Sequence, residues 1–177
     1  MNLNDTIPWG SSSNPSSWSK RIFLLILAAI GFLIALYLGL YQLHVFQNVW
    51  EPFFGNGTNA VVKSSFSRAL PIPDGLMGAF GYLCDMILVS IGDSARWKTK
   101  PWAVILYSIL VAIMGLVSIL LIIAQPVFLH TWCTLCLVSA ALSLSMVIPT
   151  MQELSATRGL IKKKRSEESF WEAVRGN

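Results

Sequence analysis

The chain has 177 residues, of which 54% are hydrophobic and 12% charged, and its formal net charge is +4. Soluble domains carry about 25% charged residues, so this composition excludes an ordinary soluble globular domain. The apolar residues are gathered in long blocks, and about 20 mostly apolar residues suffice to cross a bilayer as a helix. We therefore predict an all-α integral membrane protein that folds as a four-helix bundle.

Four blocks approach or exceed this length, at residues 22–43, 76–91, 102–124 and 132–151. Three of them contain no charged residue, whereas the second is shorter and holds Asp85. A buried or re-entrant helix is the alternative for that second block. The first block follows a polar lead of 21 residues and is too long for the core of a signal peptide. We interpret it as a retained membrane anchor.

The distribution of lysine and arginine predicts the orientation. Eleven of the 13 basic residues lie before the first block, between the second and third blocks, or after the fourth block. Only Lys63 and Arg68 lie between the first and second blocks. Basic residues accumulate on the cytoplasmic side of membrane proteins, so four crossings place both termini in the cytoplasm. The positive charge is then explained by topology and by anionic lipid headgroups, and it does not indicate nucleic-acid binding.

The segments outside the blocks complete the expected organisation. Residues 1–19 are rich in Ser, Asn, Pro and Gly, which is typical of a flexible tail. Residues 20–152 form the predicted transmembrane domain, with an external loop at 44–75 that contains a surface helix near 59–70. Residues 153–177 form a basic cytoplasmic tail, in which a capping-box spacing at 169–172 predicts a short helix.

The sharpest chemical motif is Cys133-Thr-Leu-Cys136 at the external start of the fourth block. Two cysteines three positions apart share one face of a helix and lie within bridging distance. A helix N-terminus stabilises a thiolate, and His130 could add to this effect at the more exposed Cys133. A reversible dithiol–disulfide pair is one interpretation. Two small core side chains, or a metal site formed with His130, are the alternatives.

Three further residues are candidates with ordinary explanations. Cys84 lies within the second block, where a lone cysteine is usually a small core residue. Asp85 is a functional candidate because an acid inside a span is costly, although hydrogen bonds to Ser or Tyr groups would explain it too. His44, beside the external end of the first block, could contact a bound molecule or could simply lie at the membrane interface.

Several motifs together carry a family resemblance. The CxxC motif begins the last of four apolar blocks, and a long loop follows the first. That loop ends in Ser-Ser-Phe-Ser-Arg at 64–68 and Pro-Ile-Pro at 71–73, followed by Gly-Ala-Phe-Gly-Tyr at 78–82. Residues 96–102 read Arg-Trp-Lys-Thr-Lys-Pro-Trp. Over about residues 20–152 the chain resembles the vitamin K epoxide reductase family, and residues 96–102 resemble its bacterial branches.

The resemblance implies four helices around a quinone of the menaquinone or ubiquinone type, in the bacterial cytoplasmic (inner) membrane. It implies that Cys133 and Cys136 pass electrons to this quinone, and it matches Ser65 to a serine that follows the loop cysteines of the family. The pair of loop cysteines found in the family is absent here. Residues 44–75 contain no cysteine, and Asn59 stands where the second loop cysteine would align.

Two functions are compatible with the absence of the loop cysteines. In one, the chain is a thiol–quinone oxidoreductase whose Cys133 is reached by an external thioredoxin-like protein and whose Cys136 faces the quinone. His44, Ser65 and His130 would then be the residues near the cofactor. In the other, the chain is a non-catalytic structural or quinone-lining subunit of a larger membrane complex.

Overall fold

A computed structural model describes residues 14–62 and 73–164 of the chain. The described residues form helices and contain no strand, so the predicted all-α class is confirmed for this part of the chain. The elements in chain order are α1 (Trp18–Gln42), α2 (Gly57–Val62), α3 (Asp74–Ser90), α4 (Arg96–Thr99), α5 (Pro101–Ala124), the π-helical turn η2 (Gln125–Leu129) and α6 (Thr134–Lys164).

Three of the described segments are long and apolar enough to cross a membrane: α1, α5 together with η2, and α6. Most of their large exposed side chains are apolar, for example Ile26 on α1, Ile113 and Leu120 on α5 and Ile148 on α6. Such an apolar surface is unfavourable in water and favourable in lipid. The backbone of these segments can also lie in lipid, because a helix satisfies its own backbone hydrogen bonds. The shorter α3 has 17 residues.

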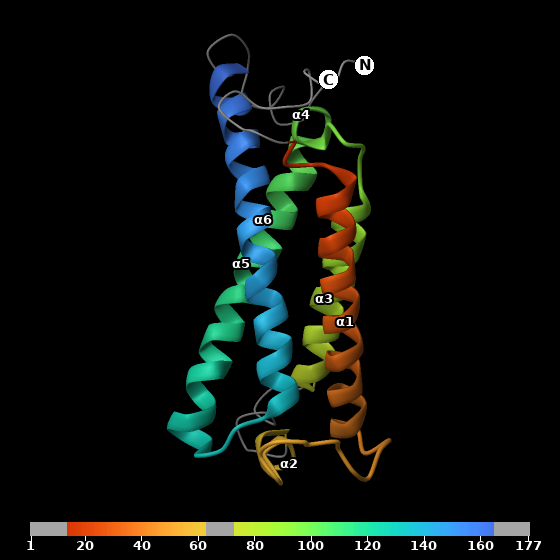
Figure 1. The fold of residues 1–177 in the computed structure, drawn as a ribbon, viewed down its shortest axis with the longest axis vertical. Coiled ribbons are helices and arrows are strands. Elements are labelled where there is room, and N and C mark those ends of the chain that lie inside the picture. Colours follow the sequence, from red (N-terminus) through yellow and green to blue (C-terminus); the bar gives the residue numbers. More distant parts are fainter. Residues whose placement is uncertain (1–13, 63–72, 165–177) are drawn as a thin grey trace.

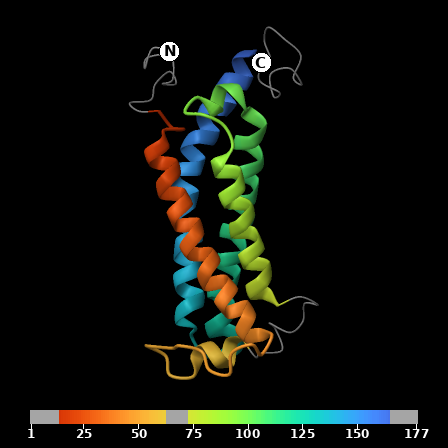
Figure 2. The ribbon, with the colours of Figure 1, turned by 90° about the vertical axis from the view of Figure 1, so that its right-hand side faces the viewer.

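The four long helices lie side by side (Figures 1 and 2). Contacts between α1 and α3 and between α5 and α6 are the most extensive, and α6 against α1 and α5 against α3 complete the packing. A Cβ atom on Gly75 would lie 2.5 Å from the backbone nitrogen of Gly39, so these glycines let α1 and α3 approach closely. The central cluster includes Ala28, Tyr82 and Tyr107.

Two boundaries differ from the sequence expectation. The last helix continues past Met151 to Lys164, so residues 153–164 extend the helix instead of beginning a separate tail. The loop between α1 and α3 contains α2 at Gly57–Val62, which overlaps only the start of the surface helix expected near 59–70. Residues 1–13, most of that expected surface helix and the helix expected near 169–172 lie outside the described residues.

Buried charge joins the helices at the end of the molecule where α1 begins and α6 ends (Figure 1). The Arg96 side chain is fully buried, and its guanidinium binds Glu153 through two hydrogen bonds of 2.6 and 2.5 Å. Arg96 also donates to the carbonyl oxygens of Leu88 and Val89, and Arg21 donates to the Val89 carbonyl. The last carbonyls of α3, which lack helical partners, are thereby satisfied by arginine side chains.

This arrangement predicts a large loss of stability on removing one charge. Glu153→Gln leaves the buried Arg96 without its counter-charge, which costs about 3–5 kcal/mol in comparable pairs. The free energy of unfolding, measured by denaturant titration in detergent, should fall by that amount. The control Ser155→Ala, at an exposed position of α6, should change it by less than about 0.5 kcal/mol. Equal effects of the two substitutions would contradict a structural role for the pair.

Candidate redox site at the start of helix α6

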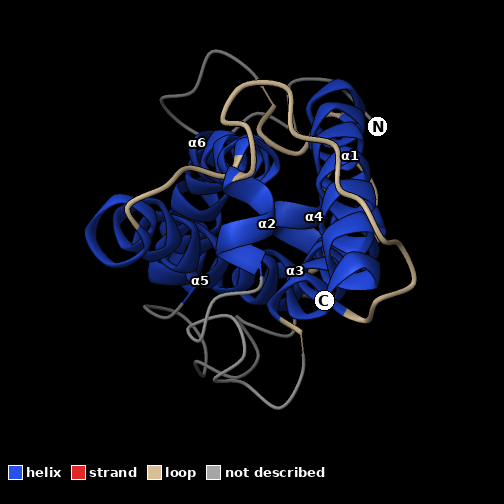
Figure 3. Ribbon diagram, turned by 90° about the horizontal axis from the view of Figure 1, so that it is seen from below, coloured by secondary structure: helices blue, strands red, loops and turns tan. Residues whose placement is uncertain are grey.

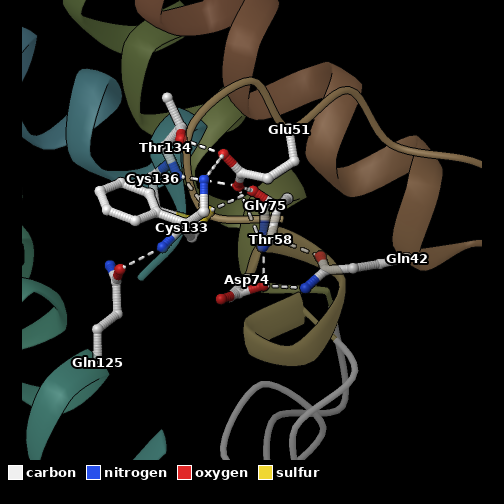
Figure 4. The surroundings of a disulfide bond; sticks show 10 residues. Gln42, Glu51, Thr58, Asp74, Gly75, Gln125, Cys133, Thr134 and Cys136 are labelled. Atoms are coloured by element: carbon white, nitrogen blue, oxygen red, sulfur yellow. Dashed lines mark hydrogen bonds between the residues drawn. A yellow bond between two sulfur atoms is a disulfide. The ribbon is translucent and has the colours of Figure 1, made fainter. Parts of the chain in front are cut away.

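The CxxC motif lies where α6 begins. Cys133 immediately precedes the first helical residue, Thr134, and Cys136 follows in the first turn. The two cysteines form a disulfide with a Cα–Cα distance of 5.2 Å (Figure 4). The backbone N–H of Cys136 lies 3.1 Å from Cys133 Sγ. Such N–H groups at the start of a helix are free to stabilise negative charge on the sulfur when the disulfide is reduced.

The two sulfur-bearing residues differ in accessibility, and the difference corrects the sequence expectation. Cys133 is 0% exposed, whereas Cys136 is only partly buried. The sequence instead predicts Cys133 as the exposed residue and Cys136 as the shielded one. In the folded protein Cys136 is the more accessible of the two.

The loop between α1 and α3 is what buries Cys133. Helix α2 lies across this end of the molecule, as the view from below shows (Figure 3). Its first residue, Gly57, packs so closely that a Cβ atom would lie 1.9 Å from the carbonyl oxygen of Trp132. On the other side, the Gln125 side chain accepts a 2.8 Å hydrogen bond from the Cys133 N–H. Glycine at 57 thus lets the loop sit directly on the residues that enter α6.

The Glu51 carboxylate fastens this loop to α6 (Figure 4). It accepts hydrogen bonds from the backbone N–H groups of Thr134, at 3.2 Å, and Thr58, at 3.1 Å, and from both threonine hydroxyls. Burial by itself raises the pKa of Glu51, but the hydrogen bonds from Thr134 and Thr58 outweigh it and lower the pKa to about 2. The group is therefore ionised at neutral pH, and its charge suits the positive end of a helix dipole.

Glu51 also changes the expected chemistry of Cys133. The Thr58 hydroxyl lies 3.4 Å from Cys133 Sγ, but it also hydrogen-bonds Glu51. One hydroxyl proton cannot serve both acceptors, and an ionised carboxylate is the stronger one. The helix N-terminus was expected to favour a thiolate at Cys133, but the carboxylate already occupies its Thr134 N–H. The negative charge of Glu51 also makes a second negative charge, the thiolate of Cys133, less favourable.

The other predicted site residues do not join this cluster. His44 and His130 are exposed, both have positive φ angles, and neither makes a hydrogen bond to the described cysteines. Ser65 lies outside the described residues. Across residues 14–62 and 73–164, no group of three His, Cys, Asp or Glu side chains could hold a metal ion. With Cys133 and Cys136 joined as a disulfide, neither offers the thiolate that the alternative metal site would need.

Asp85 and Cys84 lie away from the disulfide, within α3. Cys84 is a free and partly buried cysteine. Asp85 is 1% exposed, and its Oδ1 atom has no hydrogen-bond partner among the described residues. The hydrogen bonds to Ser or Tyr that would have explained this acid are therefore not made at Oδ1. The Tyr82 hydroxyl, one turn away, instead bonds to Ser139 and Ser143 on α6.

Glu51, Thr58 and Gln125 were not anticipated from the sequence. One signal was available for Glu51, which is the only acidic residue between His44 and Pro73. No comparable pattern singles out Thr58 or Gln125, since both are common polar residues in loops. The role of Thr58 depends on a contact with Cys133, 75 residues away, which a local pattern does not report. Gln125 is only eight residues from Cys133, but its contact depends on how the turn between α5 and α6 folds back.

The family profile described as vitamin K epoxide reductase family matches residues 22–151, which is most of the chain. No curated protein matches the chain closely enough to be counted as a relative. The matched region contains most of α1, the loop between α1 and α3, α3, α5 and the part of α6 that carries the cysteine pair. Family membership and the apolar helices together point to a membrane thiol-dependent oxidoreductase, and the disulfide is compatible with that activity. The chain belongs to the vitamin K epoxide reductase family.

Proposed function

We propose that this protein is a thiol–quinone oxidoreductase of the bacterial cytoplasmic membrane that uses Cys133 and Cys136 at the outer membrane face. The observation that carries the proposal is the disulfide at the start of α6, in a chain of this family. A helix start offers N–H groups to a leaving thiolate, and the spacing lets the pair open and close without moving the helix.

The proposed topology has four crossings, by α1, α3, α5 and α6, with both termini in the cytoplasm. It is supported by the basic residues, which are concentrated in the first turn of α1, around α4 and at the end of α6. The first residues of α1, α4 and the end of α6 lie at the same end of the molecule (Figure 1). The loop with α2 lies at the opposite end, together with the cysteine pair, where an external compartment permits disulfides.

The exchange half of the reaction follows from accessibility. A thiolate of an external thioredoxin-like protein attacks Cys136 Sγ, forms a mixed disulfide and releases Cys133 as the leaving thiol. The partner's second thiol then attacks its own sulfur in the mixed disulfide and releases Cys136. The partner is oxidised to a disulfide, and the pair here is reduced to a dithiol.

The surroundings of Cys136 fit a quinone. Cys136 packs against an apolar cluster of Leu38, Tyr41, Val62, Cys133 and Leu135, on which Tyr37 also packs. The Tyr37 hydroxyl accepts a hydrogen bond from the Trp50 N–H, so its own proton is available to a carbonyl oxygen. A quinone held here would take up the two electrons and two protons that the dithiol releases as the disulfide re-forms. The sequence candidates His44 and His130 are exposed instead.

The alternative proposal is a non-catalytic subunit of a larger membrane complex. Two observations favour it: the loop at 44–75 contains no cysteine, and that loop covers Cys133. Native-gel sizing after mild detergent extraction distinguishes the two, since a small isolated particle argues against a complex.

The topology predicts the activity of reporter fusions. A reporter enzyme that is active only outside the cytoplasm should work when inserted near Gly57 and should be silent when fused after Gly92 or Lys164. Gly57 follows one crossing and would lie outside, whereas Gly92 follows two crossings and Lys164 follows four, so both would lie in the cytoplasm. Activity after Lys164 would exclude four crossings.

Cysteine labelling should follow the accessibilities in the structure. In a Cys84→Ser background, the reduced and folded protein should react with a membrane-impermeant maleimide at Cys136 several-fold faster than at Cys133. Mass spectrometry of the digested protein measures both rates, and prior oxidation should abolish both. Faster labelling of Cys133 would show that the loop opens on reduction.

Turnover should require both cysteines. The purified protein, mixed with a reduced thioredoxin-like protein and a soluble quinone, should reduce the quinone, as followed by absorbance. Cys133→Ser and Cys136→Ser should each reduce the rate to background, because neither variant can form the intramolecular disulfide. Cys84→Ser is the matched control and should leave the rate unchanged. Equal rates in wild type and Cys136→Ser would exclude the proposed activity.

A further inference from the structure

A groove of about 480 Å³ lies between α5 and α6, away from the cysteine pair. Its walls are apolar over most of their length, formed by Ile105, Ile109 and Ala112 of α5 and by Met151 and Leu154 of α6. At one end the lining changes to Arg158 and Lys162. The groove is thus an apolar trough that ends in two positive charges.

The two cations are free to bind an anion. Arg158 and Lys162 are four residues apart, so they project from the same face of α6. Both are exposed, and neither forms an ion pair within the described part of the chain. α5 contains no acidic residue, and the single acid of α6, Glu153, is already bound by the buried Arg96.

The depth of the groove matches the boundary between hydrocarbon and headgroups. At 1.5 Å per residue, Met151 lies about 26 Å and Arg158 about 36 Å along α6 from Thr134. A hydrocarbon core is about 30 Å thick, so the apolar walls lie within it and the cations lie beyond it. The exposed Trp102, in the first turn of α5, also suits the membrane interface at this end.

We propose that this groove is a binding site for an anionic phospholipid. Arg158 and Lys162 bind the headgroup phosphate and any further negative charge of the headgroup. An acyl chain lies in the trough along Ile105, Ile109 and Ala112. Basic pockets between membrane helices bind acidic lipids in this manner, each cation adding to the attraction. The site is independent of the redox chemistry proposed above.

Native mass spectrometry of the delipidated full-length protein tests the proposal, with phosphatidylglycerol and phosphatidylcholine offered in equal amounts. Wild type should bind one phosphatidylglycerol in preference to phosphatidylcholine. The double variant Arg158→Ala/Lys162→Ala should bind it on the order of 10- to 30-fold more weakly. The residues are exposed, so the thermal unfolding of this variant should match wild type.

Two controls separate the groove from general charge effects. Lys98→Ala/Lys100→Ala removes the same charge at the same end of the molecule, outside the groove, and should keep wild-type affinity. Ala112→Trp fills the trough and should weaken binding although both cations remain. Equal loss in the Lys98/Lys100 variant, or displacement of the lipid by millimolar inorganic phosphate, would overturn the proposal. Unchanged binding in the Arg158/Lys162 variant would do the same.

Discussion

The Glu51 carboxylate is the group that fixes the loop between α1 and α3 at the end of the protein that carries the cysteine pair. It accepts hydrogen bonds from Thr58 in the loop and from Thr134 at the start of α6, and so joins two segments about 80 residues apart. A negative charge at a helix N-terminus is favourable, and charge-assisted hydrogen bonds are about twice as strong as neutral ones. This anchor acts together with the hydrogen bond from the Tyr41 hydroxyl to Asn59 of α2 and with Val62, which packs in one apolar cluster with Cys133.

This anchor bears on how a family member can lack cysteines in its outer loop. A loop disulfide would fasten the loop covalently and would carry electrons toward the CxxC pair. Here the loop is fastened by hydrogen bonds to a carboxylate, which hold position but transfer no electrons. Under the proposed function, electrons reach the pair from outside the chain, and the partly buried Cys136 is the sulfur in reach. The same carboxylate disfavours a thiolate at Cys133, which slows its departure as a leaving group, whereas the Cys136 N–H, 3.1 Å from Cys133 Sγ, favours that departure.

The opposite end of the molecule uses charge differently. Arg96 and Glu153 are both buried, and their pairing joins the residues between α3 and α5 to α6, while Arg21 holds the end of α3 from the side of α1. Helix–helix contacts in a bilayer gain little from the hydrophobic effect, because lipid is as apolar as the side chains that leave it. Specific polar contacts and close approaches such as that of Gly39 and Gly75 therefore carry more of the positioning.

The sequence by itself determined the all-helical class, the apolar blocks and the position of the cysteine pair at the start of the last helix, because block length and i,i+3 spacing act along a single helix. It also indicated the family, through motifs spread over residues that the profile matches. Only the tertiary structure decided which cysteine is covered, that α6 continues to Lys164, and that Glu51 and Thr58 belong to the site. Each of these depends on contacts between distant segments: Gly57 against Trp132, Glu51 against Thr134, and Glu153 against Arg96. Local periodicity reports which face of a helix is apolar, but it carries no information on which loop lies over that face.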